Sequence, residues 1–208
     1  MEKFENTVST LLEAEGFWVR RAFKVNVTLE EKRQVGKQSS PRPEIDMLAF
    51  HFGRNEVLAL EVKDFLDSPG VKLAHLLEEH EVPAGRHKLF TSERYRTIVL
   101  ARLLQDLMAA GMANAQTQVR LGMVVGKVNQ GQSEAIRELI EGKGWLFWSP
   151  DDIKQKVVAR TERANDPAPR AAAVAALAAS DAAAAAAVIE VDAEADVALP
   201  AKTPPPEA

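Results

Sequence analysis

Two apolar segments separated by a short polar turn constrain this 208-residue chain most strongly. The first is "PEIDMLAFHF", residues 43–52, and the second is "EVLALEVK", residues 56–63, with "GRN" between them. Short runs rich in apolar and β-branched residues favour strands, and a glycine with polar neighbours between two such runs favours a hairpin. The sequence therefore predicts an antiparallel hairpin with a two-residue loop at Gly53 and Arg54.

Helices and further strands are predicted around this hairpin. Helical spacing and capping residues predict helices over 4–15, 69–80, 92–111, 132–144 and 150–160. β-rich segments predict strands over 17–27, 87–91, 118–128 and 145–148, and the polar segment 28–43 predicts an exposed, mobile loop. Helices that alternate with strands imply parallel crossovers beside the antiparallel hairpin, so the expected class is α/β with a mixed central sheet flanked by helices.

The last part of the chain differs in composition from the rest. Residues 166–208 are rich in alanine and proline and hold seven acidic residues against two basic ones. Such a segment has too few large apolar side chains for a core, so we expect a folded domain over 1–163 and a disordered tail over 164–208. The chain has no cysteine, no signal-like N-terminus and no membrane-length apolar run, which predicts a cytoplasmic protein without membrane contact.

Three charged residues stand where the hairpin strands should be apolar: Asp46, Glu61 and Lys63. If paired residue numbers sum to 107, Asp46 lies opposite Glu61, and alternation places Lys63 on the same face. Two adjacent carboxylates repel each other unless a cation intervenes, and Mg²⁺ is commonly held by one or two carboxylates. Lys63 would then orient or deprotonate the attacking water. The alternatives are a structural ion-pair cluster and charged strand ends that are simply solvated.

A predicted helix that begins "FEN" is followed by "PEID" and, after fourteen further residues, by "EVK". This pattern resembles the PD-(D/E)xK nuclease superfamily of restriction endonucleases, Holliday-junction resolvases and Mrr-like enzymes. The resemblance covers about residues 4–130 and implies a restriction endonuclease-like fold. It implies roles for five residues: Asp46 and Glu61 as metal ligands, Lys63 as the catalytic lysine, the Val62 carbonyl as a further ligand, and Glu5 as the helix-borne glutamate of the resolvase-like branch.

Two of these assignments have alternatives in the residues themselves. The family's leading "PD" is spread here over Pro43, Glu44, Ile45 and Asp46, so Glu44 could replace Asp46 as the ligand. Glu5 is also explained as an acid in the first helical turn, where the helix dipole favours negative charge. Both alternatives stay open at the level of sequence.

The resemblance implies a Mg²⁺- or Mn²⁺-dependent endonuclease that hydrolyses DNA phosphodiesters in repair, recombination or defence, with RNA as an alternative substrate and a homodimer as an analogy. A second hypothesis is a non-catalytic nucleic-acid-binding or assembly module of the same fold, and a third is a purely structural domain. Phosphate binding needs cations near the site. The candidates are Arg20, Arg21, Lys24, Lys32, Arg33, Lys37 and Arg42, with "RHKLFTSERYR" (86–96) as a second basic cluster.

The four histidines, at 51, 75, 80 and 87, show no spacing typical of a metal site. We interpret them as ordinary residues without a role in the site.

Overall fold

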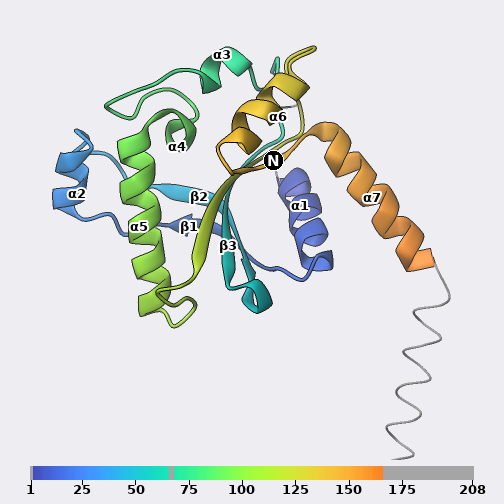
Figure 1. The fold of residues 1–208 in the computed structure, drawn as a ribbon, viewed down its shortest axis with the longest axis horizontal. Helices are drawn as coiled ribbons and strands as arrows, with labels where there is room; N and C mark the ends of the chain where they lie inside the picture. The colour runs from blue at the N-terminus through green and yellow to red at the C-terminus, as the bar shows by residue number, and fades with distance from the viewer. Residues whose placement is uncertain (1, 66–67, 166–208) are drawn as a thin grey trace, which may run out of the picture. The chain divides into compact units, whose positions relative to one another are not determined.

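The computed structural model describes residues 2–65 and 68–165. Within them the chain is an α/β fold with one five-stranded mixed sheet flanked by helices (Figure 1). The strands are β1 (Trp18–Lys24), β2 (Glu44–His51), β3 (Glu56–Lys63), β4 (Gln118–Val125) and β5 (Leu146–Trp148). The helices are α1 (Glu2–Ala14), α2 (Leu29–Gln34), α3 (Leu73–Leu76), α4 (Lys88–Thr91), α5 (Glu93–Ala109), α6 (Ser133–Gly142) and α7 (Pro150–Asn165), with a 3₁₀ turn η1 (Phe52–Arg54). Most of the predicted tail, from residue 166 on, lies outside the described residues.

The strand order is β1-β2-β3-β4-β5. The first three strands pair antiparallel, whereas β3–β4 and β4–β5 are parallel. Parallel neighbours need a crossover, and α5 and α6 lie in the two connections that supply one. The predicted mixed sheet is therefore confirmed, and none of the helices in the described ranges has the length and apolar character needed to cross a membrane.

The two faces of the sheet are covered by different helices, and Figure 1 shows α1 and α5 on opposite sides of it. The apolar stripe of α1, at Val8, Leu11 and Leu12, packs on one face of β2 and β3. Buried residues of α5 pack on the other face of the same strands, and α6 packs on β4 and β5. The face of β3 that carries Val57 and Ala59 beneath α5 is the face on which alternation places Glu61 and Lys63.

The register of the β2–β3 hairpin is the predicted one. Its ladder runs from Met47 opposite Leu60 to His51 opposite Glu56, and the residue numbers of every pair sum to 107. The predicted two-residue loop is wrong, because η1 and the left-handed Asn55 (φ 49°) together form a four-residue connection. The observed connection has one more residue on each side of the turn than the predicted loop. The paired residue numbers therefore still sum to 107, and the predicted register is retained.

The segment predicted as a mobile loop contains the helix α2. Thr28 and Glu31 form a capping box, in which each side chain bonds the other residue's backbone N–H. Arg102 of α5 donates three hydrogen bonds of 2.7–3.1 Å to the Glu31 carboxylate, and these bonds hold the pKa of Glu31 below its usual range. Apolar periodicity could not reveal α2, because polar contacts anchor it.

Two predicted elements beyond β3 are also wrong. The helix expected over 69–80 is reduced to the single turn α3, because Val71 instead forms a parallel bridge to Val128. The strand expected over 87–91 is the helical turn α4, in which the backbone N–H groups of Phe90 and Thr91 donate to the His87 carbonyl. The chain between β3 and α5 is therefore mostly irregular, and it forms one wall of the site described next.

Candidate functional site

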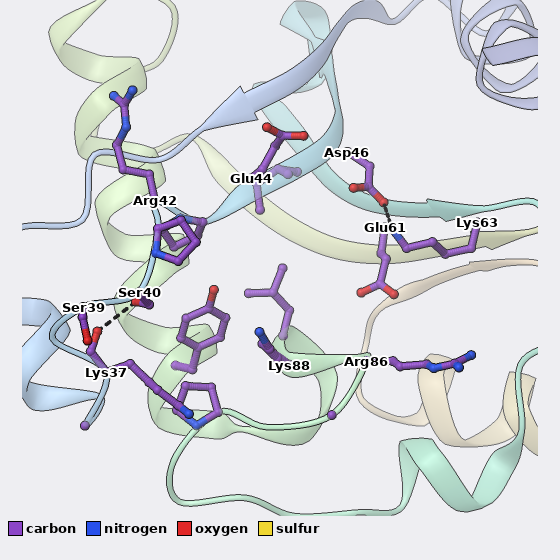
Figure 2. A pocket seen from close by; sticks show the side chains of 18 of the residues that line it. Lys37, Ser39, Ser40, Arg42, Glu44, Asp46, Glu61, Lys63, Arg86 and Lys88 are labelled. Atoms are coloured by element: carbon purple, nitrogen blue, oxygen red, sulfur yellow. Dashed lines mark hydrogen bonds and ion pairs between the residues drawn. The ribbon is translucent and has the colours of Figure 1, made fainter. Parts of the chain in front are cut away.

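A cleft of about 670 Å³ opens where β2 begins and β3 ends. Asp46, Glu61 and Lys63 line it from the sheet, and Tyr95 lines it from α5. The 36–43 segment after α2 and the irregular segment before α5 contribute the remaining walls. Figure 2 shows the three charged strand residues gathered in this cleft. The sequence-predicted trio is thus brought together on one face.

Asp46 binds both the backbone and the lysine of β3. Its Oδ2 accepts a hydrogen bond of 2.9 Å from the Val62 N–H and one of 2.7 Å from Lys63 Nζ. The described hairpin ladder ends one pair earlier, at Met47 and Leu60, so this carboxylate takes the place of the next backbone contact. The N–H and C=O of one strand residue point toward the same neighbour, so the Val62 carbonyl also faces β2.

The strand β2 is distorted at Asp46. The β1–β2 ladder omits the pair between Ala22 and Asp46, and Ala22 has a positive φ of 50°. Ile45 packs with the α5 cluster, whereas simple alternation from Met47 would place it on the α1 side. Simple alternation therefore fails between Met47 and Ile45, and Glu44, Ile45 and Asp46 all line the cleft.

Glu61 is held by a histidine. His87 Nδ1 lies 2.6 Å from Glu61 Oε1, and only 2% of the His87 side chain and 11% of the Glu61 side chain are exposed. The interpretation of all four histidines as ordinary did not anticipate this contact of His87. Spacing along the chain could not have revealed the contact, because 26 residues separate the partners and an irregular segment joins them. The only local signal is that His87 lies between two cations, Arg86 and Lys88.

Lys63 stays charged in this environment. Burial alone would lower its pKa, but the hydrogen bond to Asp46 and the negative charges of Asp46, Glu61 and Glu5 outweigh burial and raise the pKa above its ordinary value. Between the two roles expected for Lys63, the raised pKa favours orienting a reactant as a cation over removing a proton. The effect of Glu5 also places this half-buried α1 residue near the site, although it does not line the cleft.

Only two of the seven predicted cations, Lys37 and Arg42, line the cleft. Arg42 donates to Asn26 Oδ1 at 2.9 Å. The other five do not line the cleft, and Arg21 is exposed on β1. The remaining four contact other residues: Arg20 over the Phe23 ring, Lys24 with Glu44, Lys32 with the Ser40 carbonyl, and Arg33 with Glu30.

The second basic cluster supplies two more cleft cations, Arg86 and Lys88. The side chains of Lys37, Arg86 and Lys88 make no ion pair or hydrogen bond with another residue in the described ranges. The cleft therefore has carboxylates on its sheet wall and uncompensated cations on its loop walls (Figure 2). An anion that bridges a bound cation and these side chains would satisfy both walls.

Two carboxylates of the cleft, those of Asp46 and Glu61, are candidate ligands for a hard divalent cation. Across the part of the chain that the structure describes, no three His, Cys, Asp or Glu side chains form a metal-binding group. Asp46 and Glu61 nevertheless each have one carboxylate oxygen, Oδ1 and Oε2, that accepts no hydrogen bond from a described residue. Mg²⁺ needs only one or two carboxylates, because water and substrate phosphate complete its shell. Asp46 and Glu61, with the Val62 carbonyl, would hold it.

Known proteins were compared with this chain at three levels. No protein-family model, no curated protein and no solved structure matches it.

Proposed function

We propose that this chain is a metal-dependent nuclease of the PD-(D/E)xK type that hydrolyses DNA phosphodiesters. The observation that carries the proposal is the convergence of Asp46, Glu61 and Lys63 in one cleft through the 107 register of the β2–β3 hairpin. We also assign the sheet to the restriction endonuclease-like fold. That assignment is supported by the order of α1, three antiparallel strands, a helical crossover and the parallel strand β4.

Each group of the cleft has a role in this proposal. Mg²⁺ or Mn²⁺ held by Asp46 and Glu61 would neutralise their charge and polarise a phosphate ester. Lys63, held as an ammonium by Asp46, would orient the attacking water and stabilise the negative charge that develops on the phosphate. Lys37, Arg86 and Lys88 would bind neighbouring phosphates of the strand.

Cleavage assays test the proposal directly. Supercoiled plasmid, single-stranded and branched DNA, and RNA of matched sequence are incubated with the full chain in Mg²⁺, Mn²⁺ or EDTA. We expect cleavage of DNA that requires the metal and stops in EDTA. Cleavage of RNA alone would change the substrate class, and absence of cleavage from all four substrates in both metals would refute the nuclease proposal.

A binding module that does not cleave is the competing function, and one observation favours it. Each carboxylate of the cleft already has a protein partner, Lys63 for Asp46 and His87 for Glu61. A site built only as ion pairs would bind nucleic acid through its cations and ignore divalent metal. DNA binding that is unchanged by EDTA, without cleavage under any condition, would support this function instead.

Charge removal at the loop walls of the cleft should weaken DNA binding. In EDTA, the triple variant Lys37→Gln, Arg86→Gln, Lys88→Gln is expected to bind a short duplex more weakly at low salt. The slope of log Kd against log salt should fall by about 3, because each phosphate contact contributes close to one unit. Fluorescence anisotropy from about 50 to 200 mM salt measures both quantities.

The matched control removes three exposed cations from elsewhere in the fold, Lys143, Lys154 and Arg160. Equal losses in the two triple variants would mean that DNA follows the net charge of the protein and not the cleft.

A further inference from the structure

We propose that His87 is a positioning residue that fixes the Glu61 carboxylate for metal binding, an inference that rests on the proposed nuclease function. No spacing typical of a metal site points to His87 in the sequence, and His87 lies 26 positions from Glu61. Its short contact joins Nδ1 to Glu61 Oε1 at 2.6 Å. When the carboxylate binds a metal it has no proton to donate, so Nδ1 is then the donor in this contact.

The imidazole of His87 is held on several sides. Its side chain is 2% exposed, and the Phe65 ring packs edge-on against it with ring centroids 6.4 Å apart. The His87 carbonyl accepts hydrogen bonds from the backbone N–H groups of Phe90 and Thr91 and from the Thr91 hydroxyl. Because both the ring and the backbone of His87 are fixed, the donor that it presents to Glu61 is fixed as well.

This contact leaves the other oxygen of Glu61 available to the cleft. Oε1 is occupied by His87, whereas Oε2 accepts no hydrogen bond from a residue in the described ranges. A carboxylate on a strand otherwise rotates about its side-chain bonds, and locking one oxygen restricts the direction of the other. Hydrogen bonds from a second group to a metal ligand usually affect metal affinity or activity by about 10- to 100-fold.

His87 also connects the metal side of the cleft to its phosphate side. Arg86 and Lys88, its direct neighbours in sequence, both line the cleft that Glu61 faces (Figure 2). The buried histidine thus anchors, through one hydrogen bond, a tripeptide whose two outer residues are cleft cations that have no ion-pair partner among the described residues. Metal binding at Glu61 and phosphate binding at these cations are thereby placed in fixed relation.

The test compares His87→Leu, which removes the donor, with His87→Asn, whose amide nitrogen can occupy the position of Nδ1. His87→Gln places its amide nearer the position of Nε2. The readouts are Mn²⁺ affinity by electron paramagnetic resonance, kcat and KM for DNA cleavage, and the thermal midpoint of unfolding. We expect His87→Leu to lose about 10- to 100-fold in Mn²⁺ affinity and in kcat with little change in KM. His87→Asn should recover most of both quantities and His87→Gln should not.

The matched control is His80→Leu. His80 also contacts a glutamate, Glu78, at 3.0 Å, but this pair lies outside the cleft. The Mn²⁺ affinity and kcat of the His80→Leu variant should equal those of the unmodified chain. If His87→Leu does not fold, the comparison of the Asn and Gln variants decides, because both keep a polar side chain and differ in where the donor lies.

The outcomes separate this inference from the proposed function. If the unmodified chain binds Mn²⁺ and cleaves DNA while His87→Leu matches it in both, the positioning role is refuted and the nuclease stands. A lower thermal midpoint with unchanged Mn²⁺ affinity and kcat in the folded protein would reduce His87 to a structural residue. If the unmodified chain neither binds Mn²⁺ nor cleaves, the nuclease proposal and this inference fall together.

Discussion

Asp46→Asn is expected to lower the rate of metal-dependent DNA cleavage by about 100-fold or more. The amide oxygen of asparagine can still accept the hydrogen bond from the Val62 N–H, so the start of β2 should keep its structure. The negative charge that would hold the cation is lost. A bound metal contributes several kcal/mol to such reactions, and each factor of ten corresponds to about 1.36 kcal/mol. Initial cleavage rates and Mn²⁺ affinity measure the effect.

Glu56→Gln is the matched control for this variant. Glu56 lies at the opposite end of β3 and opposite His51 in the ladder, away from the cleft. The Glu56→Gln variant should cleave DNA at the rate of the unmodified chain. Full activity of Asp46→Asn combined with loss of activity in Glu44→Gln would transfer the ligand role to Glu44. Full activity of both variants would remove the proposed site from this end of the sheet.

Lys63→Met is expected to lower cleavage by a similar factor through a different step. The variant loses the ammonium that stabilises charge on the phosphate, but it keeps both carboxylates. Mn²⁺ affinity should therefore be retained or increased, because Asp46 no longer shares its oxygen with Lys63. Asp46→Asn loses metal binding and Lys63→Met does not, so the two variants differ in the metal titration even if both are inactive.

The pH dependence of the unmodified chain tests the charged role of Lys63. Its raised pKa means that the ammonium form persists at every pH below the ordinary lysine value and is lost only as the pH rises through the raised value. We expect no change in rate from Lys63 between about pH 6 and 9. A pH-dependent rise in that range that disappears in Lys63→Met would make Lys63 a base. Lys154→Met, on the exposed side of α7, is the control and should behave as the unmodified chain.

The hairpin and its register are the part of the site that could be predicted from sequence. Both faces of β2 and β3 are apolar and buried, so a connection with an even number of residues selects the odd-sum register. In that register Asp46, Glu61 and Lys63 line one cleft. The error in the predicted loop length did not change the register, because one extra residue on each side of the turn leaves the sum of the paired residue numbers unchanged.

The walls opposite the sheet could not be predicted in the same way. The helix α2 depends on Glu31 binding Arg102, which is 71 residues away, and it carries no apolar stripe. Residues 87–91 have a strand-like composition but are not part of the described sheet. They form a helical turn in which backbone N–H groups donate to the His87 carbonyl. Propensity is a weak guide where the surroundings of a segment in the fold decide which local structure it forms.

The sequence by itself determined the α/β class, the mixed sheet and the placement of three charged residues of β2 and β3 on one side of the sheet, because these follow from local periodicity and from the pairing of the hairpin. Only the tertiary structure decided which partner each charged residue has. Lys63 became the partner of Asp46, and a buried His87 became the partner of Glu61. The contact between His87 and Glu61 depends on the path of the irregular segment between β3 and α5, and no short-range pattern encodes that path.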